Sequence, residues 1–310
     1  MADIPTPEVL ERVAKICGAA VKEAMPVLGG FTEAARCVAI LADGRTCFVK
    51  AATSDATAGW LRREHIVYSG VKARFVARML GWDDDGSRPV LVLEDLSRAP
   101  WPPPWTREPI RRLRATLDEV AATTPPEGLP RLEDMRAELS GWSTVAADAG
   151  PFLSLGLCTP AWLDSVLPTF RAAERIVVLD GPDLVHLDVR SDNVCFPEDR
   201  VVLVDWNWAC RGNGRVDLAF WAPSLLAEGG PPPEEICPGP PELAATVAGY
   251  FAARAGLPAG EIPLRVRNVQ KVQLRAALPW AARAMGLPAP DGTAQGGSTG
   301  DTKKKEEWIF

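Results

Sequence analysis

The sequence has no run of apolar residues long enough to cross a membrane. A membrane helix needs about 18–20 consecutive apolar residues, and no window of the 310-residue chain approaches that length. The stretch Met1–Glu8 also lacks the basic-then-apolar layout of a signal peptide. We therefore expect a cytoplasmic protein with no membrane partner.

Clustered cysteine and clustered positive charge are missing as well. Seven cysteines are scattered along the chain without a CxxC pair, which argues against a disulfide framework or a zinc site. The net charge is −6 and no basic stripe occurs, so we expect no nucleic-acid partner. An acidic surface slightly favours cationic small molecules, although many enzymes are mildly acidic for no such reason.

The most informative residues present lie between positions 185 and 206. Asn193 follows Asp188 by five positions, and Asp205 ends the apolar run Val201–Val204. Phosphoryl transfer from a metal-bound nucleotide needs a carboxylate for the hydroxyl, an amide oxygen and a second carboxylate for the metal. We expect Asp188 to orient or deprotonate the hydroxyl of an acceptor, and Asn193 and Asp205 to bind Mg²⁺.

Three neighbouring residues are predicted to support this site. Arg190 is expected to reach the transferred phosphate, the alternative being a surface ion pair with Asp192 or Glu198. His186 is expected to orient the loop through hydrogen bonds rather than act as a base. Asp217 is expected to anchor the loop from the following helix, unless it only caps that helix.

A lysine and a glutamate upstream fit the nucleotide side of the same reaction. Lys50 ends the predicted strand 46–50, and Glu64 is the only acidic residue of the predicted helix 57–70. A lysine on a buried strand needs a partner because an unpaired charge there is costly. We expect Lys50 to hold the α- and β-phosphates and Glu64 to pair with it.

In this order the motifs resemble the aminoglycoside phosphotransferase family, whose members share the protein-kinase fold and phosphorylate small molecules. The resemblance runs from about position 28 to 222 and is strongest at 186–193 and 204–209, with 215–219 in support. It implies ATP or GTP as donor, Mg²⁺ as metal and a small hydroxylated molecule as acceptor. Leu187 stands where the family commonly has glycine, which alters the pocket wall.

The resemblance also assigns the nucleotide loop and the hinge. The loop at 28–36 is not GxGxxG, yet Gly29, Gly30 and Thr32 would let backbone amides approach phosphate. The backbone of Glu94 and Leu96 would read the purine edge.

The expected fold is α+β and bilobal, with an antiparallel-sheet N-lobe and a mainly helical C-lobe. The predicted boundaries are an N-lobe at 1–96, a proline-rich hinge at 97–105, a C-lobe carrying the catalytic loop and acceptor site at 106–290, and a disordered tail at 291–310. Helical periodicity predicts, among others, helices over 6–26 and 131–147.

The acceptor contacts are the least specified part of the prediction. Trp206, Trp208 and Trp221 are candidates for stacking on a substrate, with core packing as the alternative. Asp192 is a candidate for contacting the acceptor, with a turn as the alternative, and Glu228 is a candidate for reading an amine of the acceptor, with a solvated loop as the alternative. The leading function is a small-molecule kinase, possibly one that inactivates an antibiotic. The alternatives are a choline-, homoserine- or sugar-type metabolite kinase and an inactive nucleotide-binding scaffold.

Overall fold

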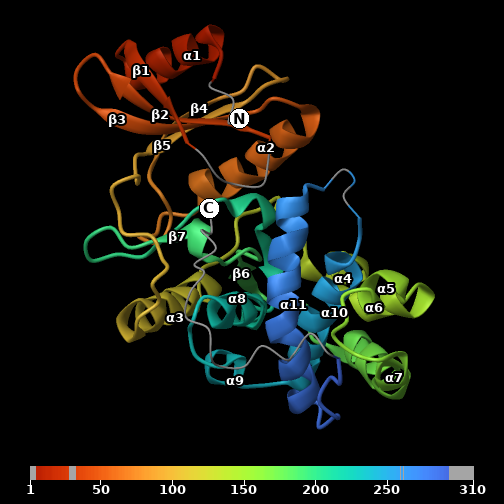
Figure 1. The fold of residues 1–310 in the computed structure, drawn as a ribbon. Coiled ribbons are helices and arrows are strands. Elements are labelled where there is room, and N and C mark those ends of the chain that lie inside the picture. Colours follow the sequence, from red (N-terminus) through yellow and green to blue (C-terminus); the bar gives the residue numbers. More distant parts are fainter. Residues whose placement is uncertain (1–4, 28–32, 259, 261, 293–310) are drawn as a thin grey trace, which may run out of the picture.

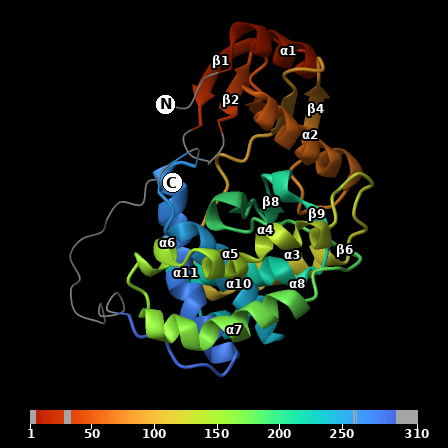
Figure 2. The ribbon, with the colours of Figure 1, turned by 90° about the vertical axis from the view of Figure 1, so that its right-hand side faces the viewer.

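The computed structural model describes residues 5–27, 33–258, 260 and 262–292. The chain forms two lobes, a small one built on a sheet and a larger one built of helices, with α2 lying where they meet (Figure 1). The view turned by 90° shows the same division (Figure 2). The expected α+β bilobal fold class is confirmed.

The N-lobe is a five-stranded antiparallel sheet. Its strand order is β1-β2-β3-β5-β4, and the strands are β1 Val21–Pro26, β2 Ala35–Leu41, β3 Thr46–Ala51, β4 Met79–Asp83 and β5 Val90–Glu94. Gly44, in the turn between β2 and β3, has φ of 85°, a conformation that glycine adopts without steric cost. The turn thereby fixes the register that places Arg36 opposite Lys50.

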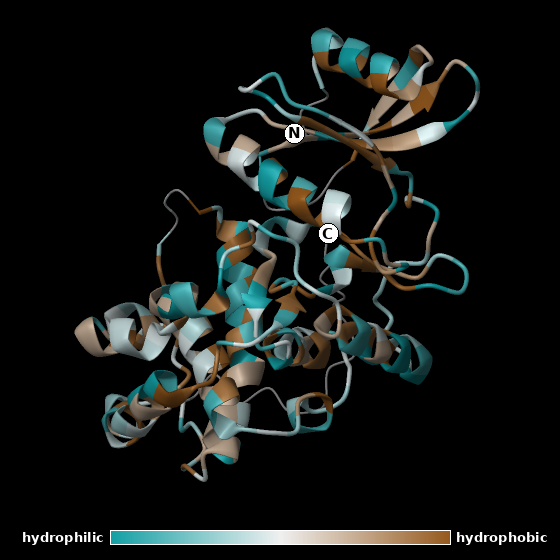
Figure 3. Ribbon diagram, turned by 180° about the vertical axis from the view of Figure 1, so that it is seen from behind, coloured by the Kyte–Doolittle hydropathy of each residue, from teal (hydrophilic) through white to brown (hydrophobic). Residues whose placement is uncertain are grey.

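Two helices cover opposite faces of this sheet. Helix α1, Pro7–Cys17, packs on the face formed by Cys37, Val49 and Val92. Helix α2, Asp55–Gly70, packs on the other face of the sheet. It contacts the strand side chains that alternate with Cys37, Val49 and Val92. Both helices alternate hydrophilic and hydrophobic residues (Figure 3), as expected when one side is buried.

The predicted helix over 6–26 is wrong beyond Cys17. Gly18 has φ of 67° and its N–H bonds to the carbonyl of Ala14, which ends the helix in a left-handed cap. The residues that follow pair as edge strand β1 with β2.

The C-lobe consists of helices around a large apolar core. They are α3 Arg107–Ala121, η1 Leu132–Met135, α4 Arg136–Leu139, α5 Gly141–Ala147, α6 Gly150–Leu153, α7 Pro160–Ile176, α8 Arg215–Ala227, α9 Pro233–Ile236, α10 Pro241–Ala255 and α11 Leu264–Ala284. No helix among the described residues is long and apolar enough to span a membrane.

The helix predicted over 131–147 is broken into η1, α4 and α5. The break before Gly141 comes from a tertiary contact, because a Cβ on Gly141 would lie 1.8 Å from the carbonyl oxygen of Gly249 in α10. This close approach of two backbones needs glycine, and helical periodicity alone does not reveal it.

Two short antiparallel strand pairs lie within the segment 183–212. Strand β6, Asp183–Val185, pairs with β9, Cys210–Gly212, and β7, Val194–Cys195, pairs with β8, Val202–Leu203. The N–H of Leu203 also donates to the carbonyl of Phe75 at 2.8 Å. These contacts attach the segment before β4 to the strand that leads to Asp205.

Glu174 on α7 is a buried carboxylate within the C-lobe core. It accepts hydrogen bonds from the N–H groups of Trp142 at 2.6 Å and Ser143 at 3.2 Å, at the start of α5. Burial raises the pKa of Glu174 to about 7, although these N–H groups act to lower it.

This raised pKa predicts a pH-dependent stability. A carboxyl that binds its proton more tightly in the folded state contributes stability that is complete below the unfolded pKa of about 4.5 and is lost as pH rises through about 7. The size is at most about 3 kcal/mol. Glu174→Gln should therefore flatten the pH dependence of the urea midpoint between pH 4.5 and 7.5, whereas the exposed Glu127→Gln should not. Parallel pH curves for the wild type and Glu174→Gln would refute this.

Candidate active site

The β7–β8 pair brings the two predicted metal ligands together. Asn193 directly precedes β7, and Asp205 follows β8 by two residues. The N–H of Val204 donates to the carbonyl of Asn193 at 2.9 Å, so the backbones next to the two side chains are joined. Asp205 itself has φ of 65°, a left-handed conformation that is uncommon outside glycine.

A second left-handed residue lies in the catalytic loop. Leu187 has φ of 65°, a conformation that glycine adopts without the steric cost that leucine bears. Both oxygens of Asp217 hold this turn, accepting from the N–H of His186 at 2.9 Å and of Leu187 at 2.7 Å. Asp217, on α8, thus anchors the loop rather than only capping its own helix.

His186 is fully buried and positions the loop from within. Its Nε2 lies 3.0 Å from the carbonyl oxygen of Val204, and its Nδ1 accepts from the N–H of Asp188 at 3.2 Å. These partners place the proton on Nε2. Burial lowers the pKa of His186 to about 4, so the ring is neutral near pH 7, and its hydrogen bonds join it to the backbone at Val204 and Asp188.

Asp188 is held by an amide and a guanidinium. Asn193 Nδ2 donates at 2.9 Å to both the carbonyl oxygen and Oδ2 of Asp188, and Arg190 lies 3.1 Å from Oδ1. Burial raises the pKa of Asp188 to about 6, against the opposing effect of Arg190. A carboxylate with a pKa in this range is suited to accept a proton near neutral pH.

Arg190 forms an ion pair on each side. It bonds bidentately to Asp192, at 3.0 and 2.9 Å, in addition to its contact with Asp188. The predicted alternative of a pair with Asp192 is therefore present, but the pair is mostly buried, with 20% of the Arg190 side chain exposed. Asp192 is thereby paired with Arg190, and its contact with the acceptor stays a prediction.

Lys50 joins the two lobes electrostatically. Its side chain is 5% exposed, and its Nζ contacts Glu64 on α2 and Asp205 Oδ1, the latter at 2.8 Å. Burial acts to lower the pKa of Lys50, but Asp205 and Glu64 outweigh it and raise the pKa. Burial also acts to raise the pKa of Asp205, yet Lys50 and Arg36 hold it at about 2.

Arg36 is a cation of this site that the sequence reasoning missed. It is 8% exposed and stands opposite Lys50 across the β2–β3 pair, on the α2 side of the sheet. Turn chemistry alone would have missed the pairing, because a two-residue turn at Asp43-Gly44 places position 36 opposite 51, whereas the strands pair Arg36 with Lys50. Arg36 adds positive charge where phosphates are expected.

The donor set fits a magnesium ion shared with a nucleotide. Since Asn193 Nδ2 is committed to two oxygens of Asp188, the amide oxygen of Asn193 is the atom left for a metal. Asp205 stays ionised. Nowhere in the described part of the chain do three or more His, Cys, Asp or Glu residues gather as a metal site. Mg²⁺ commonly uses one or two protein ligands plus phosphate oxygens, and Asn193 with Asp205 match that requirement.

The remaining nucleotide contacts are only partly described. Gly29, Gly30 and Thr32 lie outside the described residues. At the hinge, the carbonyl of Leu96 accepts from the N–H of Ala99 at 3.0 Å and from Trp101 Nε1 at 3.1 Å. The Glu94 carboxylate pairs with Arg200 at 2.6 Å, which ties β5 to the turn between β7 and β8. The reading of a purine by Glu94 and Leu96 stays a prediction.

Two of the three candidate tryptophans are core residues. Trp206 and Trp221 are 0% exposed, so neither can stack on a substrate without opening the core, and the core-packing alternative holds. Trp206 packs on His186 with 4.4 Å between ring centroids. Trp208 is 41% exposed and remains a candidate.

Glu228 connects the hinge to the catalytic loop. Its two oxygens accept from Ser191 Oγ at 2.6 Å and from Trp105 Nε1 at 2.5 Å. Burial raises the pKa of Glu228, although both donors lower it. Glu228 thus makes a positioning contact within the protein, and its contact with an acceptor amine stays a prediction.

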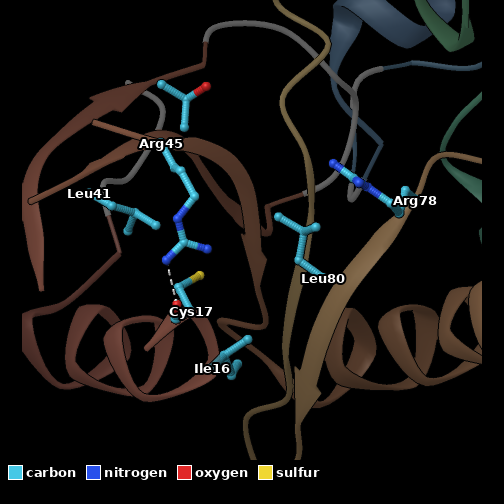
Figure 4. A pocket seen from close by; sticks show the side chains of 7 residues that line it. Ile16, Cys17, Leu41, Arg45, Arg78 and Leu80 are labelled. Carbon is cyan, nitrogen blue, oxygen red and sulfur yellow. Dashed lines mark hydrogen bonds between the residues drawn. The ribbon is translucent and has the colours of Figure 1, made fainter. Parts of the chain in front are cut away.

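A surface pocket of about 440 Å³ lies elsewhere, on the N-lobe between α1, the β2–β3 hairpin and β4 (Figure 4). Its walls contain none of the predicted site residues, and Arg45 on its rim donates to the carbonyl of Cys17 at 2.8 Å. We assign this pocket no part in phosphoryl transfer.

The two lobes, with the lysine–glutamate pair in the N-lobe and the DxxxxN loop in the C-lobe, are arranged as expected for a kinase-like fold. Comparison with solved structures agrees. A protein from Haemophilus somnus 129PT, provisionally assigned as a fructosamine-3-kinase, is 12% identical, with 85% of this chain and 96% of that chain covered at a TM-score of 0.50. An amicoumacin kinase in complex with AMP-PNP, Ca²⁺ and Ami is 11% identical, with 86% and 92% covered at a TM-score of 0.51.

These likenesses establish the fold. The chain shares the fold of these two proteins, which agrees with the kinase-like fold that the sequence resemblance implied. No protein-family model and no curated protein matches the sequence.

The two hydrogen bonds that Asp217 accepts from the catalytic loop lead to a prediction. Asp217→Asn keeps the shape but turns an N–H donor toward one of the two loop N–H groups, which should cost about 1–3 kcal/mol. The amides of His186 and Leu187 should then exchange with solvent faster, as measured by native-state hydrogen exchange. The exposed Asp180→Asn is the matched control. Unchanged protection of both loop amides in Asp217→Asn would contradict the anchoring role.

Proposed function

We propose that this protein is a small-molecule kinase that transfers the γ-phosphate of ATP or GTP to an alcohol group of its acceptor. One observation carries the proposal. Lys50 and Glu64 from the N-lobe meet Asp205 from the C-lobe in a buried ion-pair cluster, and Asn193 joins Asp205 to Asp188 through the loop contacts described above.

Each residue has a role that the reaction requires. Asp188 orients the acceptor hydroxyl and accepts its proton. Asn193 and Asp205 hold Mg²⁺, which neutralises charge on the phosphates when it is bound. Lys50 and Arg36 supply positive charge beside them. The catalytic gain comes from positioning and electrostatic stabilisation rather than from covalent chemistry by the protein.

The similar structures support a nucleotide and a divalent cation, since the amicoumacin kinase was solved with AMP-PNP and Ca²⁺. They do not fix the acceptor. An antibiotic is one option and a metabolite is the other, and the proposal places either reaction in the cytoplasm. An inactive scaffold is disfavoured because Lys50, Asp188, Asn193 and Asp205 are all present and in contact through one network.

Removing the proposed base should separate chemistry from binding. Asp188→Ala should lower turnover by a factor on the order of 10² or more, with nucleotide affinity little changed. The measurement is phosphate transfer from labelled ATP or GTP across a panel of antibiotics, choline, homoserine and sugars. The exposed Asp118→Ala serves as control. Wild-type turnover in Asp188→Ala would exclude Asp188 as the base.

Removing the proposed metal carboxylate should act on binding instead. Asp205→Asn should abolish the magnesium-dependent part of AMP-PNP affinity, because a neutral amide is a far weaker ligand for Mg²⁺ than a carboxylate. Calorimetric titration with and without Mg²⁺ measures this. Asp199→Asn, in the exposed turn between β7 and β8, is the control. If Asp205→Asn retains the full magnesium effect, the metal assignment is wrong.

A further inference from the structure

A second group of cations, distinct from Lys50 and Arg36, surrounds Tyr250 in the C-lobe. Arg254 lies one helical turn after Tyr250 on α10, and its guanidinium carbon is 3.9 Å from the centroid of the Tyr250 ring. Arg267 belongs to the first turn of α11, whose N-terminal end points toward the N-lobe (Figure 1). We call Tyr250, Arg254 and Arg267 the arginine cluster.

Arg267 is buried and forms no ion pair with any of the residues that the structure describes. It is 6% exposed, its NH1 donates to Gln270 Oε1 at 3.0 Å, and its Nε has no hydrogen-bond acceptor in the described part of the chain. A buried donor without an acceptor is rare in native proteins and calls for a physical reason.

Arg254 does not compensate for this. Its guanidinium donates to two backbone carbonyls, those of Tyr250 at 3.0 Å and Glu138 at 2.7 Å. Among the ion pairs formed by described residues, none involves Arg254 or Arg267. The two guanidinium groups act on each other electrostatically, and no carboxylate of the described residues forms an ion pair with either.

This arrangement is costly in the absence of a ligand. Burial lowers the pKa of Arg267, and the neighbouring charge of Arg254 lowers it further, yet a guanidinium remains protonated at neutral pH. A buried charge is tolerated when it is paired. An anion placed between the two arginines would supply the missing partner, and the fork of a guanidinium matches a carboxylate or phosphate group.

The Tyr250 ring packs edge-on against Phe220 of α8, with 5.3 Å between ring centroids, and α8 is the helix that carries the loop anchor Asp217. Burial raises the pKa of Tyr250, and the charges that act on its phenol are those of Arg254, Asp188, Arg190 and Arg267. Tyr250 thus lies within electrostatic range of both the proposed base and the two arginines. A small molecule with its hydroxyl at Asp188 would extend toward this cluster.

We propose that the acceptor is an anionic hydroxylated molecule whose carboxylate or phosphate group binds Arg267 and Arg254 while its hydroxyl lies at Asp188. The inference rests on the proposed kinase function and specifies its substrate class. It reverses the weak expectation of a cationic acceptor drawn from the net charge of −6, because the local charge beside Asp188 decides which group is bound.

The test titrates sulfate and acetate into the wild-type protein saturated with Mg²⁺ and AMP-PNP, at constant ionic strength. Because the nucleotide fills the phosphate site, the titration measures anion binding only at a site outside it. Arg267→Gln should weaken anion binding roughly tenfold or more, since a charge-assisted hydrogen bond of this kind is lost. Tighter binding of sulfate than of acetate would indicate an acceptor with a phosphate group, and tighter binding of acetate would indicate an acceptor with a carboxylate.

Matched variants guard against trivial explanations. Arg275→Gln removes the same charge from an exposed position of α11 and should leave anion affinity unchanged. Arg267→Lys keeps the charge and should retain part of the affinity. Arg254→Gln, at a half-buried position, provides a second loss variant, and the thermal midpoint of each variant shows that it is folded.

The outcomes are separable. The anionic-acceptor proposal is overturned if the wild type and Arg267→Gln bind anions equally well, or if the wild type binds none. In either case, Mg²⁺-dependent binding of AMP-PNP in the same samples still supports a kinase. Failure of the wild type to bind AMP-PNP with Mg²⁺ would instead remove the proposed function, and this inference with it.

Discussion

The site is organised around one buried lysine. Lys50 lies between Glu64 of its own lobe and Asp205 of the other, and a charge at that depth is stable only with such partners. Burial raises the pKa of Glu64 to about 7, whereas Asp205 is held at about 2, so Asp205 is the lasting anion of the cluster. In the proposed reaction the phosphates of the nucleotide would bind Lys50, and Asp205 would coordinate the magnesium ion.

The catalytic loop is the second constraint, and it is maintained against local backbone preference. Leu187 and Asp205 both adopt left-handed conformations, which cost about 1–3 kcal/mol each for residues other than glycine. Asp217 and the neutral His186 offset this cost by satisfying the loop's N–H groups. Such strain persists where the surrounding structure fixes it, and it aims Asp188 and Asn193 toward the same site.

The sequence predicted the parts of this protein that local chemistry determines. The β2–β3 hairpin, the pairing of Lys50 with Glu64 and the 188–193 loop follow from turn residues, strand alternation and spacing. Strand β1 and the break at Gly141 did not follow, because pairing with β2 and close contact with α10 override helical periodicity. The burial of Trp206 and Trp221 and the approach of Arg254 and Arg267 to the loop depend on contacts between distant segments, which no local pattern contains.

The most direct test is a crystal structure of the wild-type protein grown with Mn²⁺ and AMP-PNP, with Mn²⁺ located by anomalous scattering. The account predicts a manganese peak within coordination distance of the Asn193 amide oxygen and an Asp205 carboxylate oxygen, with Lys50 contacting a phosphate oxygen. A manganese ion bound to other side chains, or a nucleotide lying away from Lys50, would contradict it.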